Sequence, residues 1–201
     1  MSCKTPSLYF HVSASFHHWF IYHKGDFPPD ILKTVHQKVR TFEPVWNQYE
    51  KDILYSIPHY TGVTFPYTEI HVYYFVNPSY RPIPCIPDPV CINMAGNPDI
   101  NLILLYLIHE LVHVNIQFCN QFNALSLTLQ EVIAYTVGNQ VLKDILKEKA
   151  LPIIKSFTIP WPYNFPHIAQ HYTLDLTNTT ILNLIKTGEL TDKPITENHQ
   201  R

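Results

Sequence analysis

The sequence has few charged residues for its length. Asp, Glu, Lys and Arg make up 15% of the 201 residues, and the formal net charge is -2. An average soluble domain has about 25% charged residues. Lys and Arg do not gather into clusters, and binding to phosphate backbones or anionic headgroups depends on such clusters. We therefore expect neither a nucleic-acid partner nor a membrane partner.

A membrane-spanning segment and a disulfide framework are also missing. The longest mostly apolar run, Ile100 to Ile108, is far shorter than the roughly 20 residues that cross a bilayer. The N-terminal segment has no continuous apolar core, so it does not resemble a signal peptide. The four cysteines show no CxxC spacing. We expect thiols in a reducing compartment, with a Cys85–Cys91 bridge as the alternative. The expected location is the cytoplasm.

Apolar, aromatic and proline residues are plentiful. The chain has 13 Tyr, 11 Phe and 17 Pro, and 46% of its residues are apolar. This composition is typical of a folded protein, and the length suits one domain with a full hydrophobic core. We expect a single domain over residues 1–201, with a sheet-and-helix part at 1–96 and a helical part at 97–201.

The first part is predicted to contain strands and one interrupted helix. Apolar alternation and β-branched residues predict strands at 7–15, 60–65 and 69–76 and a short edge strand at 90–94. A helical pattern begins after Pro28-Pro29-Asp30, restarts at Pro44 and continues to about Tyr55. The proline-rich stretch 77–89 is predicted to be a loop.

The second part is predicted to be helical. Asn97-Pro98-Asp99 is a favourable helix start, with Asn as the N-cap and Pro at the first helical position. The helix is expected to reach about Phe118. A second long helix should run from near Thr128 to near Lys149, and a shorter one over 178–186. Strands followed by helices indicate an α+β fold with a small mixed sheet.

One motif in the first long helix carries a chemical function. The segment His109-Glu110-Leu111-Val112-His113 places two imidazoles four residues apart on one helix face, where both can reach one metal ion. Glu110 is turned about 100° away from His109. It is therefore placed to accept a proton from a water molecule at the metal. A chain of this composition would contain the motif by chance only roughly 0.03 times, which favours a metal site over coincidence.

A catalytic zinc site needs a third protein ligand. Glu131 is the best candidate, because it lies near the start of the second long helix, and the 17 residues before it allow the chain to turn back. An alternative stays open. Thr128 and Glu131 also have the spacing of a capping box, in which Glu131 would bond only to the N-terminus of its own helix.

The motif together with Glu131 resembles the gluzincins, the thermolysin-like clan of zinc metallopeptidases. Members of that clan pair HExxH on one helix with a glutamate on the next. The predicted order of strand, loop, short strand and motif helix before Glu131 is also similar. The resemblance implies a zincin-like fold and one Zn²⁺ held by His109, His113 and Glu131, with Glu110 as the general base and acid.

Further roles are implied by the same resemblance. The family usually supplies a Tyr or His downstream of the ligand glutamate to stabilise the oxyanion. Residues of these types in that part of the chain are His167, His171, Tyr172 and Tyr163. An extended peptide would lie along the short strand at 90–94.

The sequence also departs from the family pattern. Tyr135 stands where many members have an Asp that supports a histidine, so Asn139 or a backbone carbonyl would have to provide this support. The Gly-x-Met-Glu-Asn motif of the related aminopeptidases is absent. Cys119 occupies the position of the third metzincin histidine, which excludes that family.

Peptide-bond hydrolysis is therefore the expected activity, with an extended peptide or protein as the substrate. Two other functions stay open. The chain could be a zincin-like binding or regulatory protein, or a metal-dependent hydrolase of small amides.

Overall fold

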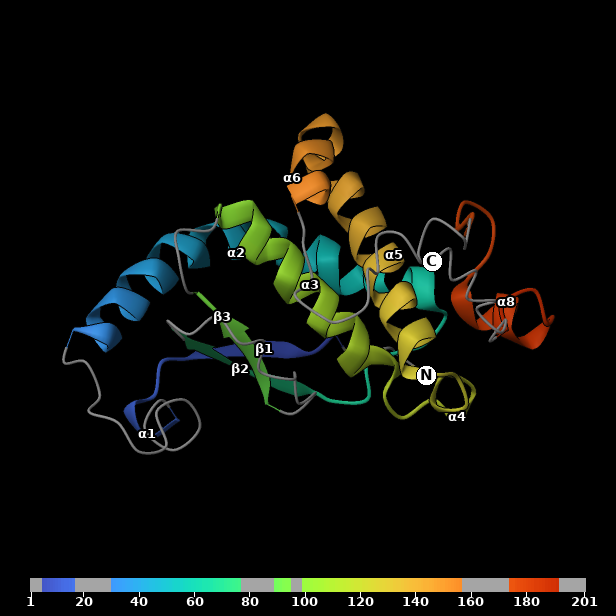
Figure 1. The fold of residues 1–201 in the computed structure, drawn as a ribbon, viewed down its shortest axis with the longest axis horizontal. Coiled ribbons are helices and arrows are strands. Elements are labelled where there is room, and N and C mark those ends of the chain that lie inside the picture. Colours follow the sequence, from blue (N-terminus) through green and yellow to red (C-terminus); the bar gives the residue numbers. More distant parts are fainter. Residues whose placement is uncertain (1–4, 17–29, 77–88, 95–98, 157–173, 192–201) are drawn as a thin grey trace, which may run out of the picture.

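The computed structural model describes residues 5–16, 30–76, 89–94, 99–156 and 174–191 (Figure 1). Helices predominate over strands, which confirms the α+β class. The elements in chain order are β1 (Ser7–His11), α1 (Ala14–Phe16), α2 (Ile31–Thr61), β2 (Glu69–Phe75), β3 (Val90–Asn93), α3 (Ile100–Ile116), α4 (Asn120–Asn123), α5 (Leu127–Leu146), a 3₁₀ turn (Lys147–Lys149), α6 (Ala150–Ser156) and α8 (Ile181–Lys186).

The three described strands form one sheet in the order β1-β2-β3. Both pairings are parallel, with Leu8 opposite Ile70 and Tyr74 opposite Ile92. The expectation of a mixed sheet is therefore wrong for these strands. A parallel pair needs a long crossover connection, and between β1 and β2 the chain forms the 31-residue helix α2. β3 is the last strand in this order, as expected for the segment at 90–94.

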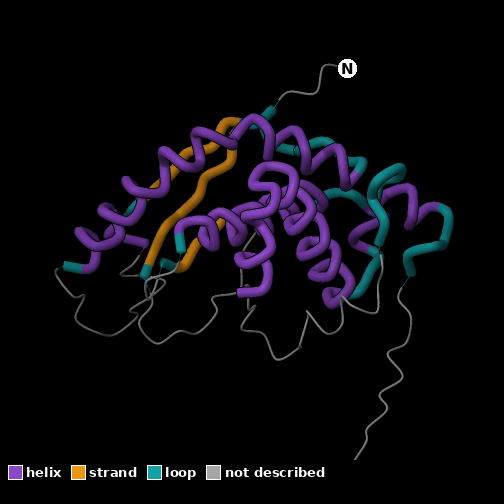
Figure 2. The backbone as a smooth tube through the Cα atoms, turned by 90° about the horizontal axis from the view of Figure 1, so that it is seen from above, coloured by secondary structure: helices purple, strands orange, loops and turns teal. Residues whose placement is uncertain are grey.

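Helix α2 differs most from the prediction. It runs without a break past Pro44 and Pro58 and ends at Thr61 (Figure 2). The predicted strand at 60–65 is thus wrong in its first two residues, and the remaining residues are not in a strand. Gly62 ends the helix with φ 77° and donates its N–H to the carbonyl of Pro58. Tertiary packing explains the continuity, because a buried apolar stripe spans both prolines: Val35, Val39, Phe42, Trp46, Ile53, Leu54 and Ile57.

The core lies between the sheet and the helices α2 and α3, which cover one face of the sheet (Figure 1). Alternate residues of the strands, including Phe10, Val72 and Ile92, belong to this core. Because side chains alternate along a strand, the residues between them lie on the outer face. The predicted strand at 7–15 ends at His11, since residues 14–16 form a helical turn.

Helix α3 is the central helix of the molecule, and it packs against α2, α5 and β3. Asp99 caps it by accepting a hydrogen bond from the Asn101 N–H at 2.7 Å, while the expected cap Asn97 lies outside the described residues. Near its C-terminus, buried Asn115 accepts a hydrogen bond from the Thr61 hydroxyl at 2.6 Å. The position of α3 relative to the end of α2 is thereby determined. No helix in the described ranges combines the length and apolar composition needed to cross a bilayer.

Candidate metal centre

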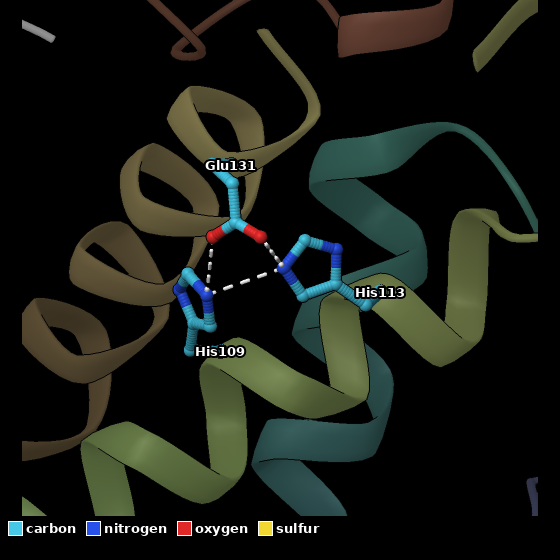
Figure 3. A group of neighbouring side chains, drawn as sticks. All are labelled: His109, His113 and Glu131. Carbon is cyan, nitrogen blue, oxygen red and sulfur yellow. Dashed lines mark hydrogen bonds and ion pairs between the residues drawn. The ribbon is translucent and has the colours of Figure 1, made fainter. Parts of the chain in front are cut away.

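His109 and His113 lie on the face of α3 that turns toward α5 (Figure 3). The side chain of His109 is buried, and that of His113 is 19% exposed. Their Nε2 atoms are 3.2 Å apart, and the ring planes make an angle of 74° with centroids 4.9 Å apart. Helical spacing thus turns two ring nitrogens toward one point, as the motif predicted.

Glu131 completes a three-residue group from the second turn of α5 (Figure 3). One carboxylate oxygen lies 3.1 Å from Nε2 of His109, and the other lies 3.4 Å from Nε2 of His113. The capping-box alternative is not formed. Helix α5 begins at Leu127, and its N-cap is Ser126, whose hydroxyl accepts a hydrogen bond from the Leu129 N–H.

Gly138 lies where α5 passes close to the first motif histidine on α3. It lies two turns after Glu131 on the same face of α5. A Cβ atom at Gly138 would be 3.8 Å from the Cα of His109 and 3.7 Å from Leu105. The backbones of α3 and α5 therefore approach closely at the first motif histidine. The sequence analysis did not identify this role, although a glycine inside a predicted helix is itself a signal of close approach.

The three donor groups suit a tetrahedral metal ion. Atoms that each lie about 2.0–2.2 Å from one tetrahedral ion are about 3.3–3.6 Å from one another. The two Nε2 atoms are 3.2 Å apart, and they lie 3.1 Å and 3.4 Å from the two different oxygens of the Glu131 carboxylate. Two imidazoles and one carboxylate are a donor set that Zn²⁺ accepts, and three protein ligands leave its fourth position open. With one carboxylate oxygen as the ligand, the three donor atoms lie within 4.8 Å of one another, so the group could hold zinc once the carboxylate turns toward the ion.

The charges at this site are strongly coupled. Burial disfavours the ionised form of Glu131, but hydrogen bonds from both histidines outweigh it, and the pKa of the carboxyl group is held well below its usual range. Burial also disfavours the charged form of His113. The hydrogen bond to Glu131 and the charges of Glu110 and Glu131 outweigh this effect, and the pKa of His113 is raised. Without metal, Glu131 is thus an anion that attracts positive charge.

Glu110 lies on α3 beside the candidate ligands and is not bonded to them. Its charge acts on His113 and also on the thiol of Cys91 in β3, whose pKa is raised to about 11, mainly by burial. The Glu110 carboxylate is therefore close to both the candidate centre and β3. The Cys91 thiol donates to the carbonyl of Pro89 at 3.3 Å. Cys85, the other half of the alternative bridge, lies outside the described residues.

The remaining predicted residues are not brought to the centre. Asn139 makes no hydrogen bond to either motif histidine within the described part of the chain, and its buried Oδ1 has no partner. The expectation that it supports a histidine is therefore wrong. Tyr135 packs at the margin of the core. The four candidates for the oxyanion, His167, His171, Tyr172 and Tyr163, lie outside the described residues, and their role stays a prediction.

Two surface hollows lie elsewhere on the described part of the molecule. One, of about 410 Å³, is lined by residues of α2, and the other, of about 250 Å³, by residues of α2, α5 and the segment 174–177. Neither is lined by His109, His113 or Glu131. The candidate centre is thus identified by its metal-binding side chains and not by a surface hollow.

Comparison of the chain with protein-family models, with curated proteins and with solved structures finds no match.

Proposed function

We propose that this protein is a zinc-dependent hydrolase that cleaves peptide bonds. The observation that carries the proposal is the convergence of His109, His113 and Glu131: the two Nε2 atoms are 3.2 Å apart, and each lies 3.1 or 3.4 Å from one oxygen of the carboxylate. Glu110 follows the first candidate ligand directly in the chain. A capping or packing role explains neither the separations nor the turning of both imidazoles toward the same carboxylate.

In this mechanism each residue has a distinct part. His109, His113 and Glu131 would hold the metal, which would polarise the scissile carbonyl and lower the pKa of a water molecule. Glu110 accepts the proton of the attacking water and passes it to the leaving amine. The displacement of Glu110 around the helix supports this role, because its carboxylate is not engaged by either histidine.

The position of β3 supports an extended substrate. β3 ends the strand order of the described sheet and packs against α3. The packing of α3 against β3 and the charge of Glu110, which contributes to the raised pKa of the Cys91 thiol, support a position of the proposed base near this strand. Binding along a strand uses main-chain hydrogen bonds and therefore accepts many side chains. We infer that a peptide lies beside β3 with its scissile bond near Glu110.

The test combines metal content with activity. The purified protein should contain one zinc per chain and cleave fluorescein-labelled casein. Glu110→Gln should keep the zinc and lower the cleavage rate by about 10²–10⁴-fold, because the amide cannot accept the proton. Glu69→Gln, at an exposed position of β2, is the matched control and should change neither quantity.

Two outcomes would contradict the proposal. Protein that takes up no zinc on titration would exclude the metal centre. Protein that holds zinc but cleaves neither casein nor a peptide library would exclude the peptidase and favour a binding function.

A further inference from the structure

A second pair of histidines lies on the outer face of the sheet. His11 is the last residue of β1, and His71 lies in β2, where it pairs with Tyr9. The two histidines are therefore diagonal neighbours on adjacent strands. Nε2 of His11 is 2.8 Å from Nδ1 of His71, and the ring centroids are 5.1 Å apart.

Aromatic rings hold both imidazoles in place. His71 stacks on Tyr9 with centroids 5.5 Å apart, and His11 stacks on Tyr73 at 4.8 Å. The ring of Phe16 in α1 stacks on Tyr73 in turn, at 5.1 Å. Both histidines are half-buried, so the stack limits the directions in which their nitrogens can point. The facing nitrogens are thus preorganised and not a chance surface contact.

The protonation state of His11 suits a metal ligand. Burial lowers the pKa of His11, and the neighbouring His71 lowers it further. His11 is therefore neutral at pH 7. Since the two facing nitrogens share a hydrogen bond, one of them carries a proton and the other presents a lone pair.

We propose that His11 and His71 form a second metal site, which takes a divalent ion with a preference for imidazole and tetragonal geometry, Cu²⁺ before Ni²⁺. Nitrogens at adjacent corners of such an ion, each about 2.0 Å from it, lie about 2.8–2.9 Å apart. The observed separation is 2.8 Å. The preference for Cu²⁺ follows from the general order of divalent affinities, in which Cu²⁺ stands above Ni²⁺ and Zn²⁺.

Coordination needs only local rearrangement. The two nitrogens point almost directly at each other, so the ion would lie beside the line that joins them, and both side chains would have to turn so that their lone pairs meet at the ion. The ring that donates the hydrogen bond moves its proton to its other nitrogen, and both facing atoms then offer lone pairs.

A bound ion would join β1 to β2 through side chains. β1 is an outer strand of five residues and pairs only with β2 among the described strands. An ion that binds the folded state but not the unfolded state stabilises the fold by mass action. The site would therefore make the docking of β1 dependent on the metal. This inference does not depend on the proposed hydrolase activity.

The experiment uses Cu²⁺ itself as the probe on the full chain. The wild-type protein, His11→Phe and His71→Phe are titrated with Cu²⁺ and followed by calorimetry and electron paramagnetic resonance. Phe keeps the stacking but removes both ring nitrogens. His36→Phe, at an exposed position of α2, is the control. We expect each sheet variant, but not the control, to bind one Cu²⁺ fewer than wild type and to lose one two-nitrogen copper signal.

Melting temperatures provide a second readout. Cu²⁺ should raise the melting temperature of wild type and of His36→Phe by the same amount, and that of either sheet variant by less. Two results would overturn the site. One is equal Cu²⁺ uptake and affinity in wild type and both sheet variants. The other is a loss in only one of them, because the proposed site requires both rings.

Discussion

Two pairs of histidines are in contact in the described part of this protein, and they differ in what surrounds them. His109 and His113 come from one helix, converge with Nε2 atoms 3.2 Å apart, and share the carboxylate of Glu131. His11 and His71 come from two strands and face each other at 2.8 Å between aromatic rings. Within the described ranges, no carboxylate bonds to the second pair.

The comparison teaches that spacing alone does not make a zinc centre. Both pairs bring two ring nitrogens within reach of one ion. Among the residues that the structure describes, only the helical pair has an anionic third donor, and zinc sites with catalytic function have three protein ligands. We expect the two pairs to respond differently to mutation, pH and metal.

Removal of a ligand from the helical pair should have the largest effect. His113→Ala leaves two donors and should abolish high-affinity zinc binding and casein cleavage together. His11→Phe should leave zinc content and cleavage at the wild-type level. Zinc measured by mass spectrometry, with circular dichroism to check folding, tests the contrast. Tight zinc binding by His113→Ala would remove the distinction between the two pairs.

The carboxylate itself is tested by Glu131→Gln. The amide keeps the size of the side chain but loses the charge. Loss of a residue that only supports a ligand lowers metal affinity by about 10–100-fold, and loss of the ligand Glu131 should lower zinc affinity by at least as much. Ser126→Ala is the control for helix capping. It should cost about 0.5–2 kcal/mol of stability and leave zinc affinity unchanged. If instead Glu131→Gln bound zinc normally, the third ligand would have to be sought elsewhere, with His167 first.

The pH dependence should separate the metal-free and zinc-bound proteins. The lowered pKa of Glu131 stabilises the fold above its ordinary value of 4.5, and this contribution is lost as the pH falls through the lowered pKa. The raised pKa of His113 stabilises the fold below its ordinary value of 6.5, and this contribution is lost as the pH rises through the raised pKa. Metal-free protein should therefore be most stable between about pH 4.5 and 6.5.

The affinity for zinc should rise with pH where the stability of the metal-free protein falls. Zinc binding requires neutral imidazoles, so zinc affinity should increase as the pH rises past the pKa of His113. Melting curves of metal-free protein and zinc titrations between pH 5 and 8 test both statements. A metal-free protein that becomes more stable from pH 6 to 8 would contradict the coupling of His113 to Glu131.

The smallest effect is expected at Gly138. The nearest atoms to an added Cβ are 3.7–3.8 Å away, an ordinary contact distance. Because Ala is favoured over Gly inside a helix, Gly138→Ala should stabilise the protein by about 0.5–1 kcal/mol. Zinc affinity should be unchanged. Gly138→Leu should push α5 away from His109 and weaken zinc binding. Thermal melting and zinc titration of both variants test this, and equal zinc affinity in Gly138→Leu would contradict the role of close approach.

Much of the fold was predictable where the pattern is local. The β2 and β3 segments and the cores of α3 and α5 follow from apolar periodicity. The predictions failed where distant packing decides. At Pro44 the sequence pattern predicts an interruption of the helix. The segment stays helical because α2 buries an apolar stripe against both the sheet and α3. The parallel pairing of β1 with β2 also depends on the crossover that α2 makes.

The same division holds for the candidate site. The geometry of His109 and His113 required only the sequence, because hydrogen bonds between residues four apart set the positions of side chains on a helix face. Glu131 had two possible roles in the sequence, and the close approach of α5 at Gly138 decided between them. The contact between His11 and His71 joins residues 60 positions apart. No local pattern encodes it, because strand register is a property of the assembled sheet.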